Sequence, residues 1–198
     1  MSKDALDVMK EFVKEKNVSF VFECVDMERD PHIIEYDKSG LFLLDIIKND
    51  MEFLRYPFDD MCNVAHMLGL EHKKKAAVLN NWQEFYDWYF EIMDEDYKYH
   101  EKNIEGFVIE DSRGYMVKRK ITYYSFWKFM RGVAHSIIRY GQVKQGITSA
   151  LTTPLANKFY GWVKEMKETG SLSDCKTDIC TLRKMFLESE RGADFINK

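Results

Sequence analysis

Three charged side chains near the middle of the chain have the spacing of a site for a phosphate and a divalent metal. Glu105 opens the run Glu105-Gly106-Phe107-Val108-Ile109, and a turn-like stretch leads on to Tyr115-Met116-Val117-Lys118-Arg119-Lys120. Two extended segments joined by a glycine-closed turn predict a β-hairpin, in which alternation places Lys118 and Lys120 on one face. A carboxylate suits Mg²⁺, and two ammonium groups neutralise phosphoryl charge. The alternative is an edge hairpin whose charges only face water.

A fourth candidate, Glu23, lies within an apolar segment. Val18 to Val25 is rich in β-branched and aromatic residues and predicts a strand in which Glu23 shares a face with Val21 and Val25. A buried carboxylate is costly unless it is paired or binds a ligand. Glu23 is therefore either at a solvent-exposed end of the strand or part of a polar site.

Composition limits the classes of function. The chain has 198 residues and a formal net charge of -4, so any contact with nucleic acid needs a local basic patch. The four cysteines show no paired CxxC spacing, which favours a reducing cytoplasm. The apolar runs are too short to span a bilayer, so we expect no membrane partner.

The remaining patterns predict elements that would position these residues. An aromatic stripe at helical spacing from Asn81 to Met93 is typical of core. A near-continuous apolar run, Leu41 to Ile47, indicates a central strand. We expect strands at 18–25, 33–36 and 41–47, a hairpin at 105–121, and helices at 4–16, 59–68, 81–93, 125–140, 154–170 and 174–190.

Four segments in this order resemble the later motifs of ATP-dependent RNA ligases, in the phage-type branch of the covalent nucleotidyltransferase superfamily. They are Val21-Phe22-Glu23-Cys24-Val25, Leu41-Phe42-Leu43-Leu44-Asp45-Ile46-Ile47, Glu105-Gly106-Phe107-Val108-Ile109 and Val117-Lys118-Arg119-Lys120. The stretch Asp30-Pro31-His32-Ile33-Ile34-Glu35-Tyr36 is also similar to that branch. No single motif is specific, but four of them in this order, followed by helical sequence, are a much stronger signal. The resemblance covers roughly residues 1 to 125.

The resemblance implies a role for each candidate residue. Glu23 would lie by the nucleotide ribose, Glu105 would coordinate the catalytic metal, and Lys118 and Lys120 would bind the phosphate. Relatives often place an adenine-stacking aromatic where this chain has Leu44; Phe42 faces the same side and is the substitute we expect. The implied cofactors are ATP and Mg²⁺ or Mn²⁺.

The resemblance also implies a fold and a division of the chain. We expect an α+β protein. Residues 1–122 would form a partial nucleotidyltransferase (ATP-grasp-like ligase) antiparallel sheet with helical insertions, the C-terminal portion of an adenylyltransferase domain. Residues 123–198 would form a small all-helical domain.

One part of the family's chemistry is missing from these residues. In that family the reaction begins with a lysine in a Lys-x-Asp-Gly-like motif upstream of the strand that corresponds to Val18 to Val25, and we expect that this chain starts too late to contain it. We therefore expect the C-terminal part of an RNA ligase that joins 5′-phosphate and 3′-hydroxyl RNA ends, as in RNA repair, through a lysyl-AMP intermediate. The lysine would come from a missing segment or from a separate polypeptide, and this chain alone would be inactive. The alternative is a non-catalytic relative that binds RNA or a nucleotide.

A basic stripe follows the hairpin. Lys128, Arg131, His135 and Arg139 share one side of the expected helix 125–140, opposite its apolar side. Cations in a row can track an RNA backbone by releasing counterions, so Lys128, Arg131 and Arg139 are the candidate RNA-binding residues. The alternative is an ordinary solvated helix face. Sheet edges left open by the missing segment would favour a homodimer.

Overall fold

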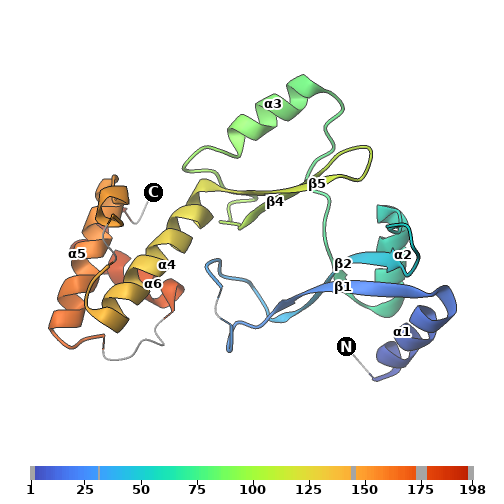
Figure 1. Ribbon diagram of the computed structural model, residues 1–198, viewed down its shortest axis with the longest axis horizontal. Helices are drawn as coiled ribbons and strands as arrows, with labels where there is room; N and C mark the ends of the chain where they lie inside the picture. The colour runs from blue at the N-terminus through green and yellow to red at the C-terminus, as the bar shows by residue number, and fades with distance from the viewer. Residues whose placement is uncertain (1–2, 31, 144–145, 173–177, 196–198) are drawn as a thin grey trace. The chain divides into compact units, whose positions relative to one another are not determined.

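The computed structural model describes residues 3–30, 32–143, 146–172 and 178–195. The chain is an α+β protein that divides into two compact units. Unit 1 contains residues 1–30 and 36–78, and unit 2 contains residues 31–35 and 79–198. Figure 1 shows the elements of both units.

Unit 1 is a small sheet covered by two helices. Strand β1 (Val18–Val25) pairs with β2 (Gly40–Lys48) in antiparallel fashion, and β2 pairs with β3 (Glu71–His72) in parallel. The central position of β2 confirms the expectation for its apolar run. Helices α1 (Lys3–Lys16) and α2 (Phe58–Leu68) pack on this sheet through their apolar sides. The buried residues are Val18, Leu43, Ile46, Met61, Ala65, Leu68 and Leu70.

Unit 2 begins with a helix packed on a hairpin. Helix α3 (Trp82–Glu91) starts at Asn81, whose side chain accepts a hydrogen bond from the Glu84 backbone N–H at 3.0 Å. Strands β4 (Gly106–Glu110) and β5 (Met116–Lys120) form the expected antiparallel hairpin. Trp88 of α3 contacts Phe107 of β4, with ring centroids 5.2 Å apart, and Figure 1 shows α3 beside the hairpin.

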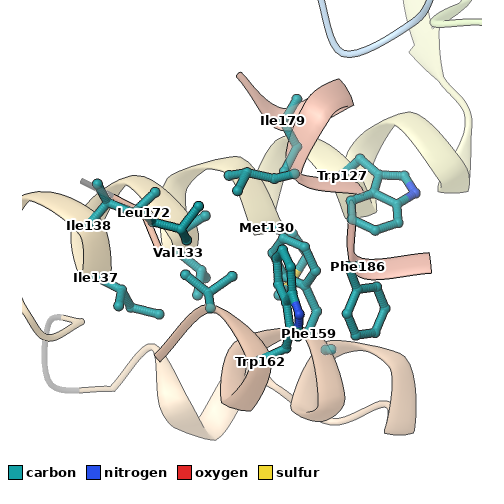
Figure 2. Packing of buried hydrophobic residues seen from close by; sticks show 14 of the residues in the cluster. Trp127, Met130, Val133, Ile137, Ile138, Phe159, Trp162, Leu172, Ile179 and Phe186 are labelled. Atoms are coloured by element: carbon teal, nitrogen blue, oxygen red, sulfur yellow. The ribbon is translucent and has the colours of Figure 1, made fainter. Parts of the chain in front are cut away.

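The core of unit 2 lies among three helices. Helix α4 (Thr122–Tyr140) continues directly from β5, and α5 (Pro154–Glu168) and α6 (Ile179–Leu187) pack against it. Figure 2 shows Trp127, Met130, Phe159, Trp162 and Phe186 interlocking in this core, and the Trp127 and Phe159 rings meet edge to face at 5.4 Å. The first residues of the helix expected at 174–190, residues 174–177, lie outside the described residues.

The strand expected at 33–36 is wrong. These residues form no strand; Ile33 is buried in the helical core of unit 2. The Arg183 guanidinium donates to the carbonyl oxygen of Ile33 at 3.0 Å and lies over the rings of Tyr123 and Trp127. Ile33 therefore belongs to a helical core, where the buried Arg183 satisfies its backbone carbonyl.

The aromatic stripe of α3 is not the core that its spacing predicts. None of the ten residues of α3, all of which the structure describes, is buried. Phe85, Trp88 and Tyr89 are half-buried, whereas Trp82, Tyr86 and Phe90 are exposed. Six aromatic residues in ten cannot all face one side of a helix, and the surplus faces outward.

Two further observations bear on the expected organisation. Unit 2 contains both the hairpin and the helices that follow residue 122. The division expected near residue 122 therefore remains a proposal about functional domains. In the part of the chain that the structure describes, no helix combines the length and the apolar character that a bilayer crossing requires.

Candidate nucleotide and RNA site

A carboxylate and a lysine meet at the base of the hairpin. The Lys120 ammonium donates to the Glu105 carboxylate in a half-buried ion pair. Gly106, the first residue of β4, pairs with Lys120 of β5 and has φ +149°. A Cβ at this position would collide with the Arg119 carbonyl oxygen and lie 2.8 Å from the Lys120 Cα. The glycine is thus what lets Glu105 and Lys120 come together.

Tyr124 completes this cluster, although it was not among the predicted site residues. The Lys120 Nζ lies 5.0 Å from the centre of the Tyr124 ring, and the Lys128 Nζ lies 5.7 Å from it. Partial burial, the charge of Glu105 and a hydrogen bond to Glu105 raise the pKa of Tyr124 above its ordinary value. The available signal was a tyrosine four residues after Lys120, which reaches it only because α4 starts at Thr122 rather than near Ser125.

The remaining cations surround this cluster unevenly. Lys118 is exposed on the same face of the hairpin as Lys120, opposite Val108. Lys128, Arg131 and Arg139 are all exposed along α4. The positive charge of Arg131 opposes the rise in the pKa of Tyr124. Lys128 and Arg131 thus lie near the cluster, while Arg139 lies two turns of helix further along.

The two candidates of unit 1 form a pair of their own. Glu23 of β1 lies directly opposite Phe42 of β2 in the antiparallel register, so their side chains share one face of the sheet. Glu23 is exposed and Phe42 is half-buried. A break in register between Val21 and Phe22 shifts the alternation of β1 at this point. This break separates Glu23 from Val21 in the alternation, and Val25, which follows Glu23 in unbroken register, is buried while Glu23 is exposed.

A buried ion-pair network anchors the same strand. Asp45 of β2 is only 8% exposed. The Arg55 guanidinium donates to its carboxylate at 3.1 Å, and the Lys73 ammonium does so at 3.4 Å. A carboxylate buried in this way is tolerated because it is paired on two sides. The network ties β2, which also carries Phe42, to the segments that contain Arg55 and Lys73.

The unit 2 cluster fits a phosphate that carries a magnesium ion. Glu105 is its one carboxylate, against the cations Lys118, Lys120, Lys128 and Arg131. Among the described residues, no group of three or more histidine, cysteine, aspartate or glutamate side chains could hold a metal by itself. Mg²⁺ is commonly held by one or two carboxylates together with substrate phosphates and water, which is what a single half-exposed Glu105 can supply.

A comparison with known proteins gives an independent result. The sequence model of a T4-type family described as RNA ligase matches residues 2–130, which include both pairs of candidate residues and the Tyr124 cluster. No curated protein matches the chain.

Proposed function

Because the chain belongs to the T4-type RNA ligase family, we propose that it forms the later part of an ATP-dependent RNA ligase that joins 5′-phosphate and 3′-hydroxyl RNA ends. The observation that carries this proposal is the cluster of Glu105, Lys120 and Tyr124, made possible by the close approach at Gly106. The family match supports the ligase class, and the cluster supports a site for phosphate chemistry.

Each residue has a proposed task. Lys118 and Lys120 bind the α-phosphate of the nucleotide, where negative charge grows as its bonds exchange. Glu105 holds Mg²⁺, which supplies charge neutralisation at that phosphate. Glu23 hydrogen-bonds the ribose, and Phe42 beside it supports the base. This proposal requires the face of β1 and β2 that carries Glu23 and Phe42 to act on the same nucleotide as the hairpin.

The nucleophilic lysine comes from outside these residues in this proposal. In the complete enzyme the lysine amine attacks the α-phosphate of ATP, forming a P–N bond and releasing pyrophosphate. The RNA 5′-phosphate then attacks the phosphorus of the lysine-bound AMP, which breaks the P–N bond and frees the lysine amine. Finally the 3′-hydroxyl attacks the RNA 5′-phosphate, loses its proton to solvent and expels AMP. Only the first two steps use the lysine as nucleophile or leaving group. The last step can therefore be tested with this chain in the absence of that lysine.

RNA reaches the site along α4. Lys128 lies over the Tyr124 ring, and Arg131 and Arg139 continue the exposed basic side of the helix. Cations in a row hold phosphates at successive positions, and the resulting affinity falls steeply with salt. Replacing Arg131 and Arg139 by alanine should reduce the slope of affinity against salt; an unchanged slope would remove these residues from the proposal.

The test supplies the chain with RNA that is already adenylated at its 5′ end, together with a 3′-hydroxyl acceptor and Mg²⁺. In this proposal the chain alone is inactive with ATP because it lacks the lysine, so we expect no labelled protein when it is mixed with ATP and Mg²⁺. The last step needs no lysine, so with the adenylated donor we expect sealed RNA and released AMP, and loss of sealing in Glu105→Ala. Lys184→Ala, which removes an exposed lysine of α6, is the matched control. Binding without sealing would favour the non-catalytic relative. A chain that neither binds nor seals the RNA would contradict the proposal.

A further inference from the structure

Helix α3 presents a row of aromatic side chains that nothing in unit 2 covers. Trp82 is 74% exposed, Tyr86 47% and Phe90 57%. They lie at intervals of four residues, so they form one row about 12 Å long. The Tyr86 and Phe90 rings are already in contact, with centroids 4.4 Å apart. Large aromatic side chains exposed in a contiguous row are typical of an interaction surface.

The charges of α3 disfavour RNA as the partner of this aromatic row. Every charged residue of α3 is acidic: Glu84, Asp87 and Glu91. Asp94, Glu95 and Asp96 follow, and all three are exposed. Aromatic rings can stack on bases, but a polyphosphate backbone would be repelled by this fringe of carboxylates. The row therefore suits a partner that carries positive charge.

The same chain carries a basic row of matching length. Arg131, His135 and Arg139 of α4 are exposed and lie at the same intervals of four residues, again spanning about 12 Å. The sequence of α4 contains no aspartate or glutamate. Phe129 and Tyr140 of α4 are also exposed, and the Arg139 guanidinium lies 5.3 Å from the centre of the Tyr140 ring. Guanidinium groups bind the faces of aromatic rings, as Arg119 does over Tyr89 within unit 2 at 5.1 Å.

We propose that the aromatic row of α3 in one copy of the chain docks on the basic row of α4 in a second copy. Arg131 and Arg139 lie against aromatic rings of the other copy, and Asp87 and Glu91 on the same helix as those rings balance the charge of the two arginines. The contact joins α3 of one copy to α4 of the other. When both copies make it reciprocally, two such contacts form and the assembly closes as a dimer. It needs no nucleotide site and therefore stands or fails separately from the ligase proposal.

The contact also has a consequence for RNA. The basic row of α4 is the surface proposed to hold the RNA backbone, so a copy engaged through α4 cannot bind RNA there. RNA carrying a 5′-phosphate should therefore dissociate the dimer. RNA binding that requires Arg131 and Arg139 but leaves the dimer intact would overturn the proposed contact, because the α4 row would then be free in the dimer.

The first experiment is sedimentation velocity of the full chain over a range of concentrations at low and high salt. We expect a concentration-dependent dimer that dissociates as salt rises. Trp82→Ala together with Phe90→Ala should weaken dimerisation at least about tenfold, the effect of losing one interface hot spot. Phe53→Ala, which removes an exposed aromatic side chain from unit 1, is the matched control. A chain that stays monomeric, or a control variant that weakens the dimer equally, overturns the proposal.

A charge exchange makes the test specific to these two rows. One variant carries Asp87→Arg with Glu91→Arg, and the other carries Arg131→Glu with Arg139→Glu. Each variant alone should be monomeric, because like charges then face each other across the contact. Mixing them should restore association, which also shows that both variants are folded. A mixture that remains monomeric overturns the assignment of the contact to α3 and α4.

Discussion

The sharpest test of the site's construction is the substitution Gly106→Ala. Gly106 has φ +149°, a conformation that costs a residue with a side chain about 1–3 kcal/mol. The added Cβ would also collide with the Arg119 carbonyl oxygen and crowd the Lys120 Cα at 2.8 Å. Overpacking of this kind costs about 1–3 kcal/mol more. Together the two effects remove a large part of the stability of a domain, which is about 5–15 kcal/mol in total.

The measurement is urea unfolding followed by circular dichroism, with Gly132→Ala as the matched control. Gly132 lies inside α4 with nothing within 4 Å of the position that a Cβ would take. Alanine is favoured over glycine inside a helix, so the control should gain about 0.5–1 kcal/mol. The two glycine-to-alanine changes should therefore have opposite signs. An unfolding midpoint of Gly106→Ala equal to that of the wild type would refute the close approach of β4 and β5 at the site.

Three further predictions concern the cluster, a helix cap and the core. Tyr124→Phe loses the hydrogen bond to Glu105 and should lower the free energy of unfolding by about 1 kcal/mol. Because the pKa of Tyr124 is raised in the folded protein, this contribution is present below about pH 10 and disappears as pH rises further. The urea midpoints of the two proteins should therefore converge at alkaline pH. Asp178 caps α6 through Thr181, and Asp178→Ala should cost about 1 kcal/mol while Asp178→Asn costs less. Burial opposes ionisation of Asp178, but its hydrogen bonds together lower its pKa. The difference in unfolding free energy between the wild type and Asp178→Asn should therefore shrink as pH falls below about 4. A difference that stays constant with pH would contradict the cap. Phe159→Ala empties the centre of the unit 2 core and should cost about 3–5 kcal/mol in thermal or urea unfolding; a loss below that of Tyr124→Phe would contradict the packing.

The sequence predicted those elements whose local pattern and tertiary role agree. The amphipathic patterns of α1 and α2 and the central strand β2 were all predicted, because in each the apolar spacing matches the face that is buried. The left-handed Gly69 ends α2 where its position in the sequence indicates.

The mistakes arose where a distant contact decides the outcome. Ile33 has the β-branched character of a strand residue, but Arg183, 150 positions later in the chain, fixes its carbonyl in a helical core. No local pattern carries that information. The aromatic residues of α3 similarly have the composition of a core helix, and the direction that Trp82 faces depends on the hairpin that covers the other side.

The candidate site was predicted in part. The alternation in β5 placed Lys118 and Lys120 on one face, and the register places Gly106, next to Glu105, opposite Lys120. Tyr124 was not predicted because its place depends on how tightly β5 passes into α4. Glu23 and Phe42 were expected around the same nucleotide, and the structure places them opposite each other on β1 and β2. Their joint action with the hairpin remains a proposal.

The most direct test of the central claim is the preference of the chain for adenylated RNA. The affinity for RNA with an adenylated 5′ end, divided by the affinity for the same RNA with a 5′-phosphate, isolates the contribution of the nucleotide. If Glu23, Glu105, Lys118 and Lys120 act on one nucleotide, the wild type should prefer the adenylated RNA. Glu23→Ala and Lys120→Ala should each lower that preference about tenfold, the effect of losing one hydrogen bond to a charged group. A preference that is absent, or that survives both substitutions unchanged, would contradict the account.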